Sequence, residues 1–396
     1  MSLQRIYLDS NATTRPAAAV VEAMTRAMCD DWANPSSVHR SGSEAKRLVE
    51  LARESIAKLV GCQEREIVFT SGGTEGANLA IRGTMEHFAT SAPKRRVLVT
   101  THFEHSAVRE LAQRIGKHGG EVVWLPSDPA RPGTADLSAL ESLLAERADE
   151  IALVSLMWAN NETGAITDVA RAGAICREAG VRFHTDATQW IGKMPTDLAA
   201  MQIDLASFAA HKFHGPKGVG ALYVRRTVRI EPQSIGGPQE RDRRGGTENV
   251  PAIAGMGVAS MHASEWLASN GSERGAGRRD RFERDVATAT GGIVHSSTTP
   301  RLWNTTNIAF ARLEAEAILM LLSERGVDAS AGAACSSGSL DPSPVLLAMG
   351  IAPELAHGSI RFSLSRETTD AEIEEATRRV IAVITRLRES TSAAVS

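Results

Sequence analysis

The sequence has 396 residues, of which 42% are hydrophobic and 23% charged, an ordinary balance for a globular protein with a sizeable core. This length is sufficient for two domains, or for one large domain with a smaller one attached. The formal net charge of -3 argues against general binding to nucleic acid or to an acidic membrane surface.

The first residues of the chain and its cysteines indicate the cellular compartment. The segment MSLQRIYLDSNATT lacks the basic and then apolar pattern of a secretion signal, and no apolar run is long enough to span a bilayer. The four cysteines have no paired spacing, which is typical of free thiols in a reducing compartment rather than of disulfides or a zinc site. They are Cys29, Cys62, Cys176 and Cys335. We therefore expect a cytoplasmic protein.

The first long helical pattern is SEAKRLVELARESIAKLVG, which begins at Ser43. Gly61 is expected to end this helix, because glycine readily adopts the left-handed conformation that closes a helix. The spacing predicts that four residues share the apolar face: Leu48, Leu51, Ser55 and Leu59.

Seven short apolar segments follow, and helical patterns such as LSALESLLAER separate them. The predicted strands are 66–70, 97–101, 122–126, 151–157, 181–186, 203–209 and 219–224. Several are apolar on both faces, as strands buried between two layers of helices are. The sequence therefore predicts an α/β domain with a mostly parallel sheet.

The pattern changes near residue 267. The polar, Gly- and Arg-rich stretch 267–280 is expected to be a loop near a domain junction. Beyond it, the strand-like segments NIAF and IRFSLS, a loop of small residues around Cys335 and a C-terminal helix predict a second, α+β domain. We expect an N-terminal segment at 1–15 packed with the small domain, a large domain at 16–262 and a small domain at 263–396, with the cysteine loop at about 329–343.

The segment FTSGGTEGANLAI, from Phe69 to Ile81, leads from a predicted strand through Gly73 and Thr74 into a predicted helix. Small residues let backbone N–H groups approach an anion, and the start of the helix adds the positive end of its dipole. The pattern predicts a phosphate site, although a strand-to-helix turn that only needs glycine would look the same.

Two further motifs follow predicted strands. In HTDATQW, Asp186 is well placed to pair with the ring nitrogen of a ligand, but a metal site with His184 or a structural hydrogen bond would use the same residues. In AAHKFHGPKG, Lys212 lies at the edge of an apolar strand, where partial desolvation lowers the pKa of an amine and favours Schiff-base chemistry. The alternative is a solvated loop lysine. A metal site at His211 and His214 lacks a third ligand nearby.

Cys335 lies in ASAGAACSSGSLDPS, from Ala329 to Ser343, a run of small residues that packs poorly. An exposed thiol in such a loop suits transfer between two partners, whereas a structural cysteine usually has larger apolar neighbours. The alternative is an incidental loop cysteine.

Together these segments resemble the cysteine desulfurases of the NifS/IscS type, within the class V aminotransferase family. The resemblance extends in order from YLDSNATTRP at Tyr7, through NPSSVHRSG at Asn34, to HGSIRFSLSRETTDAEIE at His357, and so covers nearly the whole chain. It implies fold type I of the pyridoxal-phosphate (PLP) enzymes, which is aspartate aminotransferase-like, with a large PLP-binding domain and a smaller C-terminal domain.

The resemblance also implies roles around the PLP ring. Lys212 matches the lysine that forms a Schiff base with PLP and later moves protons, and Asp186 matches the aspartate that keeps the ring nitrogen protonated. Gln189 matches the glutamine that contacts the ring hydroxyl, and Asn161 an asparagine beside that hydroxyl and the substrate. His105 matches the histidine stacked on the ring, which is also a candidate for proton transfer.

Other positions match contacts to the phosphate and the substrate. The phosphate positions within one subunit are Gly73, Thr74 and His211. Thr247 resembles a threonine that reaches the phosphate of the neighbouring subunit, so a homodimer with shared active sites is implied. Arg361 matches the arginine that binds the substrate carboxylate, a task suited to its planar guanidinium, and Asn34 is a second candidate for that end of the substrate.

The activity implied is removal of sulfur from L-cysteine, giving L-alanine and a persulfide on Cys335 that passes to an iron–sulfur scaffold or other acceptor protein. No intrinsic metal is expected, although Cys335 would transiently contact an iron–sulfur cluster on such a partner. RRGGTENVPAIAGMG and SSGSLDPSPVLLAMG resemble the NifS branch, which serves nitrogenase assembly. The alternatives are a selenocysteine lyase or another class V aminotransferase, and a non-catalytic protein that keeps the fold for binding.

Two positions depart from the family pattern. Ala209 stands where a serine usually donates to the phosphate, so one hydrogen bond worth roughly 1–3 kcal/mol is missing, and Ser207 or a water could compensate. Ser10 stands where the family usually has asparagine. Both changes bear on cofactor affinity rather than on the covalent chemistry.

Overall fold

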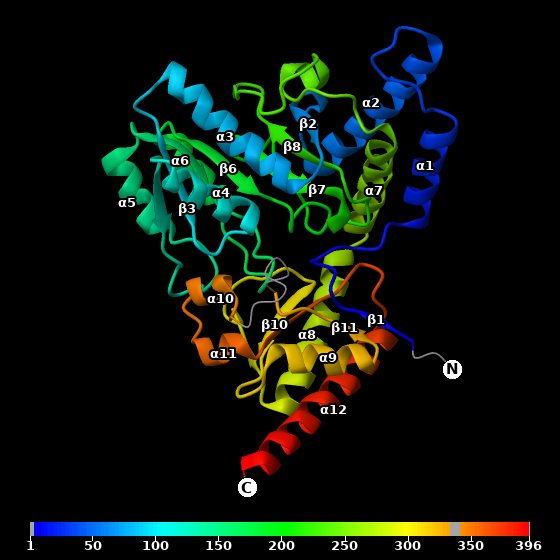
Figure 1. The fold of residues 1–396 in the computed structure, drawn as a ribbon, viewed down its shortest axis with the longest axis vertical. Coiled ribbons are helices and arrows are strands. Elements are labelled where there is room, and N and C mark those ends of the chain that lie inside the picture. The colour runs from blue at the N-terminus through cyan, green and yellow to red at the C-terminus, as the bar shows by residue number, and fades with distance from the viewer. Residues whose placement is uncertain (1–3, 333–340, 396) are drawn as a thin grey trace.

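A computed structural model describes residues 4–332 and 341–395 of the chain (Figure 1). It has a larger unit, at the top of Figure 1, and a smaller unit below that carries both ends of the chain. The larger unit is built on a seven-stranded sheet with the strand order β2-β8-β7-β6-β5-β3-β4.

The strands of this sheet confirm the predicted fold class. They are β2 (Ile67–Thr70), β3 (Val97–Thr101), β4 (Glu121–Leu125), β5 (Ile151–Ser155), β6 (Arg182–Asp186), β7 (Leu205–Ala209) and β8 (Gly220–Val224). Each overlaps one of the seven predicted segments. Neighbouring strands from β4 through β7 are parallel, while β8 is antiparallel to β2 and β7.

Helices cover both faces of the sheet. On one face lie α3 (Gly73–Ser91) and α4 (Ser106–Lys117). The other face is covered by α1 (Ala18–Cys29), α2 (Arg40–Val60), α5 (Leu137–Arg147), α6 (Val169–Glu178) and α7 (Val250–Ala268). Short 3₁₀ turns are η1 (Glu64–Glu66), η2 (Ala210–Lys212) and η3 (Gln239–Asp242). Because the strands lie between two helix layers, they are apolar on both faces.

The buried face of α2 differs from the predicted one. Gly61 ends the helix in the left-handed conformation, as predicted, but Leu51 is 44% exposed. The buried side includes Ala45, Ala52 and other small residues instead. A Cβ on Gly257 of α7 would lie only 2.7 Å from the Cα of Ala52, so the two helices approach closely. The predicted face was right at Leu59 but wrong at Leu51, because the buried face has small residues where α7 approaches and the larger Val49 and Ile56 beside them.

The smaller unit has its own sheet and core. Strands β9 (Ile293–Val294), β10 (Thr305–Ala309) and β12 (Ser359–Ser363) form an antiparallel sheet in the order β12-β10-β9. The N-terminal strand β1 (Ile6–Tyr7) pairs in parallel with β11 (Val327–Asp328). The helices are α8 (Gly271–Thr290), α9 (Ala315–Glu324), α10 (Pro344–Ala348), α11 (Pro353–His357) and α12 (Asp370–Val395). Phe282, Phe310 and Phe362 are fully buried in this core.

The stretch 267–280 is largely helical, so the loop predicted there was wrong. Helix α8 begins at Gly271, and its glycines allow close packing against two indole rings. A Cβ on Gly271 would clash with the ring of Trp266, and one on Gly275 with the ring of Trp303. Packing in the folded protein therefore outweighs the low intrinsic helix propensity of glycine, which a sequence pattern cannot show.

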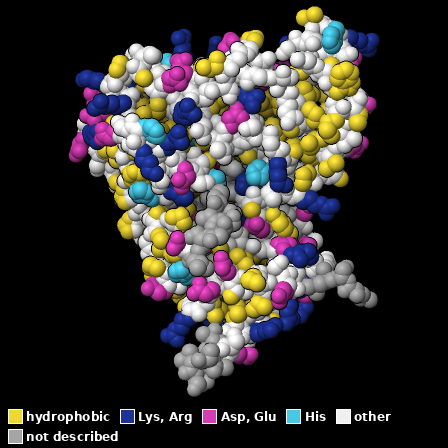
Figure 2. Space-filling model, in the orientation of Figure 1, with side chains coloured by type: hydrophobic (Ala, Val, Ile, Leu, Met, Phe, Trp, Pro, Cys, Tyr) yellow, Lys and Arg dark blue, Asp and Glu magenta, His cyan; other side chains and the backbone are white. Residues whose placement is uncertain are grey.

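Lys and Arg side chains are interspersed with Asp and Glu over the face seen in Figure 2. Hydrophobic side chains gather over α1 at the upper right of this view, where α1 and the turn after it expose Val21, Met28 and Trp32. In the ranges 4–332 and 341–395, no helix combines the length and the apolar character needed to cross a membrane.

Candidate active site

A cavity of about 180 Å³ opens at the carboxyl ends of the central strands. Its walls come from the ends of β6 and β7, from the chain after β5, and from the starts of α3 and α4. Parallel sheets bind ligands at this edge, because strand ends and helix N-termini converge there. Eight of the predicted site residues line the cavity: Gly73, Thr74, His105, Asn161, Asp186, Gln189, His211 and Lys212.

The other predicted site residues lie elsewhere. Arg361 lines an adjoining cavity of about 340 Å³, which shares residues with the first. Asn34 and Thr247 are exposed and line neither cavity. Asn34 Oδ1 instead accepts a hydrogen bond from the backbone N–H of Ser36 at 2.9 Å. Cys335 lies outside the described residues.

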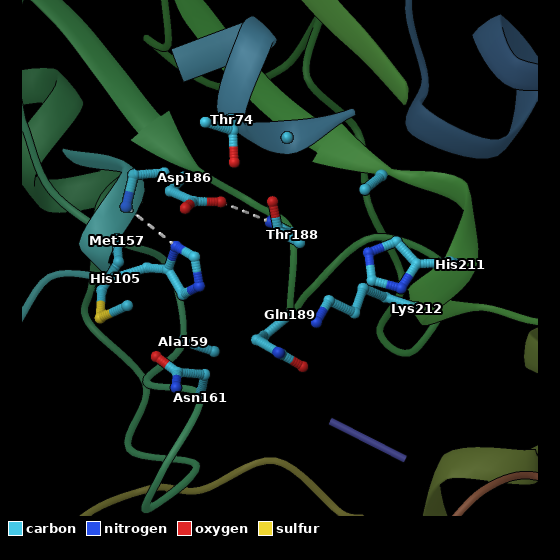
Figure 3. Close-up of a pocket in the computed structure, with 13 residues that line it drawn as sticks. Thr74, His105, Met157, Ala159, Asn161, Asp186, Thr188, Gln189, His211 and Lys212 are labelled. Carbon is cyan, nitrogen blue, oxygen red and sulfur yellow. Dashed lines mark hydrogen bonds between the residues drawn. The ribbon is translucent and has the colours of Figure 1, made fainter. Parts of the chain in front are cut away.

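Lys212 reaches the first cavity from the turn η2, directly after β7. Its Nζ donates to the backbone carbonyls of Asn11 at 2.7 Å and Ala12 at 2.9 Å, so the N-terminal segment helps to hold the amine in place. Figure 3 shows Lys212 on the opposite side of the cavity from His105. Burial, assisted by the charge of Lys212, lowers the pKa of the adjacent His211 to about 4. His211 is therefore neutral near pH 7.

His105 and Asp186 face the cavity from the other side (Figure 3). His105 is the N-cap of α4, and its Nδ1 accepts a hydrogen bond from the backbone N–H of Ala107 at 3.2 Å. In a neutral imidazole this leaves the proton on Nε2. Asp186 ends β6 and is 7% exposed, and its Oδ1 accepts from the backbone N–H of Thr188 at 2.9 Å. A carboxylate held in this way can pair with a protonated ring nitrogen.

The first turn of α3 has the groups that can hold an anion. Gly73 and Thr74 begin the helix, where backbone N–H groups have no partner within the helix. A Cβ on Gly73 would lie 2.8 Å from Thr188 Oγ1, so glycine keeps this space open. In the part of the chain that the structure describes, Thr188 Oγ1 and Asn161 Oδ1 are buried without a hydrogen-bond partner. Buried polar atoms of this kind fit a site for a polar, phosphate-bearing ligand.

His184 is a core residue rather than part of the cavity wall. Its ring is fully buried, with Nδ1 2.8 Å from Ser155 Oγ and Nε2 3.1 Å from Ser207 Oγ, and burial lowers its pKa to about 4. Because Ser207 is engaged here and does not line the cavity, it cannot replace the hydroxyl missing at Ala209. Counting only described residues, no three His, Cys, Asp or Glu side chains lie together as metal ligands.

A buried hydrogen-bond network beside the cavity was not predicted. Lys193 Nζ donates to Gln189 Oε1 at 2.6 Å and to Asn11 Oδ1 at 2.9 Å. Gln189 Nε2 in turn donates to the backbone carbonyl of Asn11 at 3.0 Å. Burial holds the pKa of Lys193 well below its usual value, and the charge of Lys212 adds to this effect. The available signal was a lysine in the otherwise mostly apolar segment WIGKMP, four residues after Gln189.

Arg361, on β12, provides a cationic wall in the second cavity. It is 2% exposed, and its Nη1 donates to the Asn161 carbonyl at 3.0 Å while Nη2 pairs with Asp9 Oδ1 at 2.6 Å. Its Nε has no hydrogen-bond partner in the ranges the structure covers. A guanidinium fixed at two nitrogens still has further N–H groups and can bind a carboxylate in a defined orientation.

Glu162 lies close to Gly332 and to Ser343, which flank the segment that contains Cys335 in the sequence. Its Oε2 accepts a hydrogen bond from Ser343 Oγ at 2.7 Å, and a Cβ on Gly332 would lie 2.6 Å from the same oxygen. The side chain is buried, which raises its pKa. Both ends of the segment that carries Cys335 therefore meet at one carboxyl group, which lines the second cavity together with Gly332. This role was also missed, although Glu162 adjoins Asn161 in the NNETG motif.

Comparisons with a family model, with known sequences and with solved structures all point to the same family. Residues 6–375 match the family model for class V aminotransferases. The cysteine desulfurase NifS of Azotobacter vinelandii is 43% identical over 385 residues, which cover 97% of this chain and 93% of that protein. Among solved structures, a NifS-like protein has a TM-score of 0.87 at 36% identity, covering 96% of this chain and 100% of its own. A structure described as SspA in complex with cysteine has a TM-score of 0.78 at 31% identity, covering 92% and 100%.

Proposed function

The chain belongs to the class V aminotransferase family, and from this membership we propose that it is a PLP-dependent cysteine desulfurase. Such an enzyme moves sulfur from free L-cysteine to its own cysteine, here Cys335, and releases L-alanine. The family resemblance predicted from the motifs is confirmed. The observation that carries the proposal is the convergence of Lys212, Asp186 and His105 on one cavity, with Arg361 in the adjoining one.

The residues of the first cavity fit PLP. In this proposal, Gly73, Thr74 and His211 hold the phosphate. Asp186 pairs with the ring nitrogen, and Gln189 and Asn161 lie at the ring oxygen. When bound, PLP supplies an electron sink that stabilises negative charge on the substrate carbon beside the amine. Asp186 supports this chemistry by keeping the ring nitrogen protonated.

Lys212 and His105 handle protons in this proposal. Nζ of Lys212, in its unprotonated form, accepts the α-proton of the substrate. The carbonyls of Asn11 and Ala12 orient that nitrogen and stabilise the ammonium group, because each accepts an N–H from it. His105 carries a proton at Nε2, on the side of the ring turned away from its helix, and can donate it to the reacting substrate.

Cys335 takes the sulfur in this proposal. Its thiolate forms an S–S bond as the Cβ–S bond of the substrate breaks, and the electron pair left on carbon takes up a proton, which makes alanine. Cys335 lies outside the described residues, but it follows Gly332 by three residues. Its Cα therefore lies within roughly 11 Å of the Gly332 Cα in any conformation. Since Gly332 lines the second cavity, the thiol can reach the substrate there.

The substrate carboxylate binds Arg361 in this proposal. Asp9 and the Asn161 carbonyl each accept one N–H of the guanidinium, so its plane is oriented before the substrate arrives, and each of the two terminal nitrogens keeps a second N–H. An arginine held in this way loses little conformational freedom on binding. Asn34, a second candidate for the carboxylate, does not line either cavity of the single chain.

We further propose that two copies of the chain form a homodimer in the cytoplasm. Thr247 is exposed in the single chain, as a residue that serves a neighbouring active site must be. The apolar residues exposed by α1 and the following turn suit burial against a second copy. The sulfur acceptor in this proposal is an iron–sulfur scaffold protein, and the similarity to NifS favours the branch that serves nitrogenase assembly.

Two variants test this function. The wild-type protein is expected to take up PLP covalently, so that borohydride reduction followed by peptide mass spectrometry finds the cofactor on Lys212, whereas K212A binds it without attachment. C335A is expected to keep PLP but to form alanine from cysteine at least about 100-fold more slowly, because the nucleophile is absent.

The outcomes separate the rival functions. Full alanine formation by C335A from selenocysteine, with little from cysteine in the wild type, would instead indicate a selenocysteine lyase. A keto-acid product would indicate a transaminase. A wild-type protein that takes up no PLP would contradict the proposal and leave the non-catalytic alternative.

A further inference from the structure

Lys193 is a buried amine beside the active site that lines neither cavity. It is 4% exposed and lies just after the turn that contains Gln189. Its Nζ donates to two amide oxygens, Gln189 Oε1 and Asn11 Oδ1, and neither partner is a carboxylate. Burying a lysine in this way is costly, so the arrangement calls for an explanation.

The backbone determines which way each of these amides points. Gln189 Nε2 lies 3.0 Å from the Asn11 carbonyl oxygen, which can only accept a hydrogen bond, so the nitrogen must be at that end. The same reasoning applies to Asn11, whose Nδ2 lies 3.1 Å from the Asn161 carbonyl. Both amides therefore present oxygen to Lys193. A charged and a neutral amine both have the two hydrogens that these oxygens need.

Gln189 is thus held at both ends of its amide. One Nε2 hydrogen is used by the Asn11 carbonyl, and the second remains for a ligand in the cavity that Gln189 lines. Turning the amide by 180° would set its oxygen against the carbonyl of Asn11 and its N–H group against the amine of Lys193. Such a turn would lose the hydrogen bond to the Asn11 carbonyl, and an ammonium group at Lys193 could not accept the N–H turned toward it.

We propose that Lys193 is a positioning residue that locks the Gln189 amide with its N–H toward the ring oxygen of the cofactor. This inference rests on the proposed function, because the ring oxygen is that of PLP. Without Lys193, only the Asn11 carbonyl opposes a turn of the amide, and a turned amide would offer its oxygen to the ring oxygen, which repels it. Burial and the nearby charges of Lys212 and Arg361 disfavour the charged form of Lys193 and lower its pKa.

The test measures cofactor affinity in K193M, Q189A and the double variant K193M/Q189A. Each apoprotein is titrated with PLP and with 3-deoxypyridoxal 5'-phosphate, which lacks the ring oxygen. We expect K193M to bind PLP roughly 10-fold more weakly than wild type, since one hydrogen bond to the ring oxygen is lost. Binding of the deoxy analogue should change by less than about twofold, and the double variant should bind PLP no more weakly than Q189A, because both changes act through one amide.

A spectroscopic readout accompanies the titration. The absorbance of bound PLP changes with pH, and K193M and Q189A should shift the midpoint of that change in the same direction, since both alter the hydrogen bond to the ring oxygen. K94M serves as the control, because it is the same substitution at a side chain that is 85% exposed. If K193M does not fold, K193Q keeps one donor and should lose less affinity than Q189A.

Three results would overturn the inference while leaving the proposed function intact. One is equal weakening of PLP and of the deoxy analogue in K193M, which would indicate a general effect on the fold. A second is wild-type affinity for PLP in K193M, and a third is losses that add fully in the double variant. If the wild-type protein binds neither cofactor, the proposed function itself fails, and this inference fails with it.

Discussion

Ala209 leaves a methyl group on the wall of the first cavity, next to the proposed phosphate site. Ser207 cannot supply the missing donor, because its Oγ is bonded to His184 in the core. We therefore expect A209S to add a hydrogen bond to the phosphate and to lower the Kd for PLP by roughly 10-fold, as measured by titration of the apoprotein. Pyridoxal, which has no phosphate, is the matched control and should bind both proteins equally. Unchanged PLP affinity in A209S would contradict the expectation.

Single residues differ in how far their roles can be predicted from sequence. Lys212 and Asp186 each stand at or just after the end of a predicted strand, so their shared position at one edge of the sheet follows from the pattern, whereas His105 was assigned from the family resemblance. Lys193 could not be predicted in the same way. Its partner Asn11 is 182 residues away in the sequence, and only the folded chain brings the two side chains together.

Helix α8 gives a test in which two glycines of one helix behave in opposite ways. A Cβ on Gly275 would clash with the ring of Trp303, whereas a Cβ on Gly277 meets nothing within 4 Å. We expect G275A to lower the free energy of unfolding by about 1–3 kcal/mol, because a packed contact must open. G277A, the matched control, should raise it by up to about 1 kcal/mol, since alanine favours a helix. Urea denaturation followed by circular dichroism measures both, and equal effects would contradict this assignment.

Whole elements were predictable where one physical cause determines them. The strands of the large sheet, apart from the half-buried edge strand β4, are almost wholly buried on both faces, so their apolar runs indicated strands directly. Elements whose form depends on close packing could not be predicted. Helix α8 contains glycines that pattern analysis takes as loop signals, and the buried face of α2 is set by contact with α7 at Gly257.

At the scale of the whole molecule, Asn11 joins the two units. Its Nδ2 donates to Thr305 Oγ1 at 2.9 Å in the smaller unit, and its Oδ1 accepts from Lys193 of the larger unit. We expect N11A to lower the free energy of unfolding by about 2–4 kcal/mol, because buried polar groups lose their partner. The two units should also unfold less cooperatively, so that loss of bound PLP and loss of helicity in urea no longer coincide.

The control for N11A is Q113A, at an exposed position on α4, which should leave both transitions at their wild-type urea concentrations. Coincident transitions in N11A would show that other contacts join the units. The change of pattern after residue 267 is the reason why the sequence predicts two domains. The residue that links them could not be identified, because its partners lie in distant parts of the chain.

Glu162 contacts Ser343 and lies close to Gly332, but this arrangement does not constrain the number of residues between them. Because Gly332 and Ser343 both approach one carboxyl group, the fold fixes the distance between them. For any flexible chain between two fixed points, doubling its length costs only about 0.6 kcal/mol in closure entropy. We therefore expect insertions or deletions between these two residues to cost little stability. In the proposed function, the reach of Cys335 and the acceptor proteins within that reach can then differ among related proteins while the catalytic chemistry stays the same.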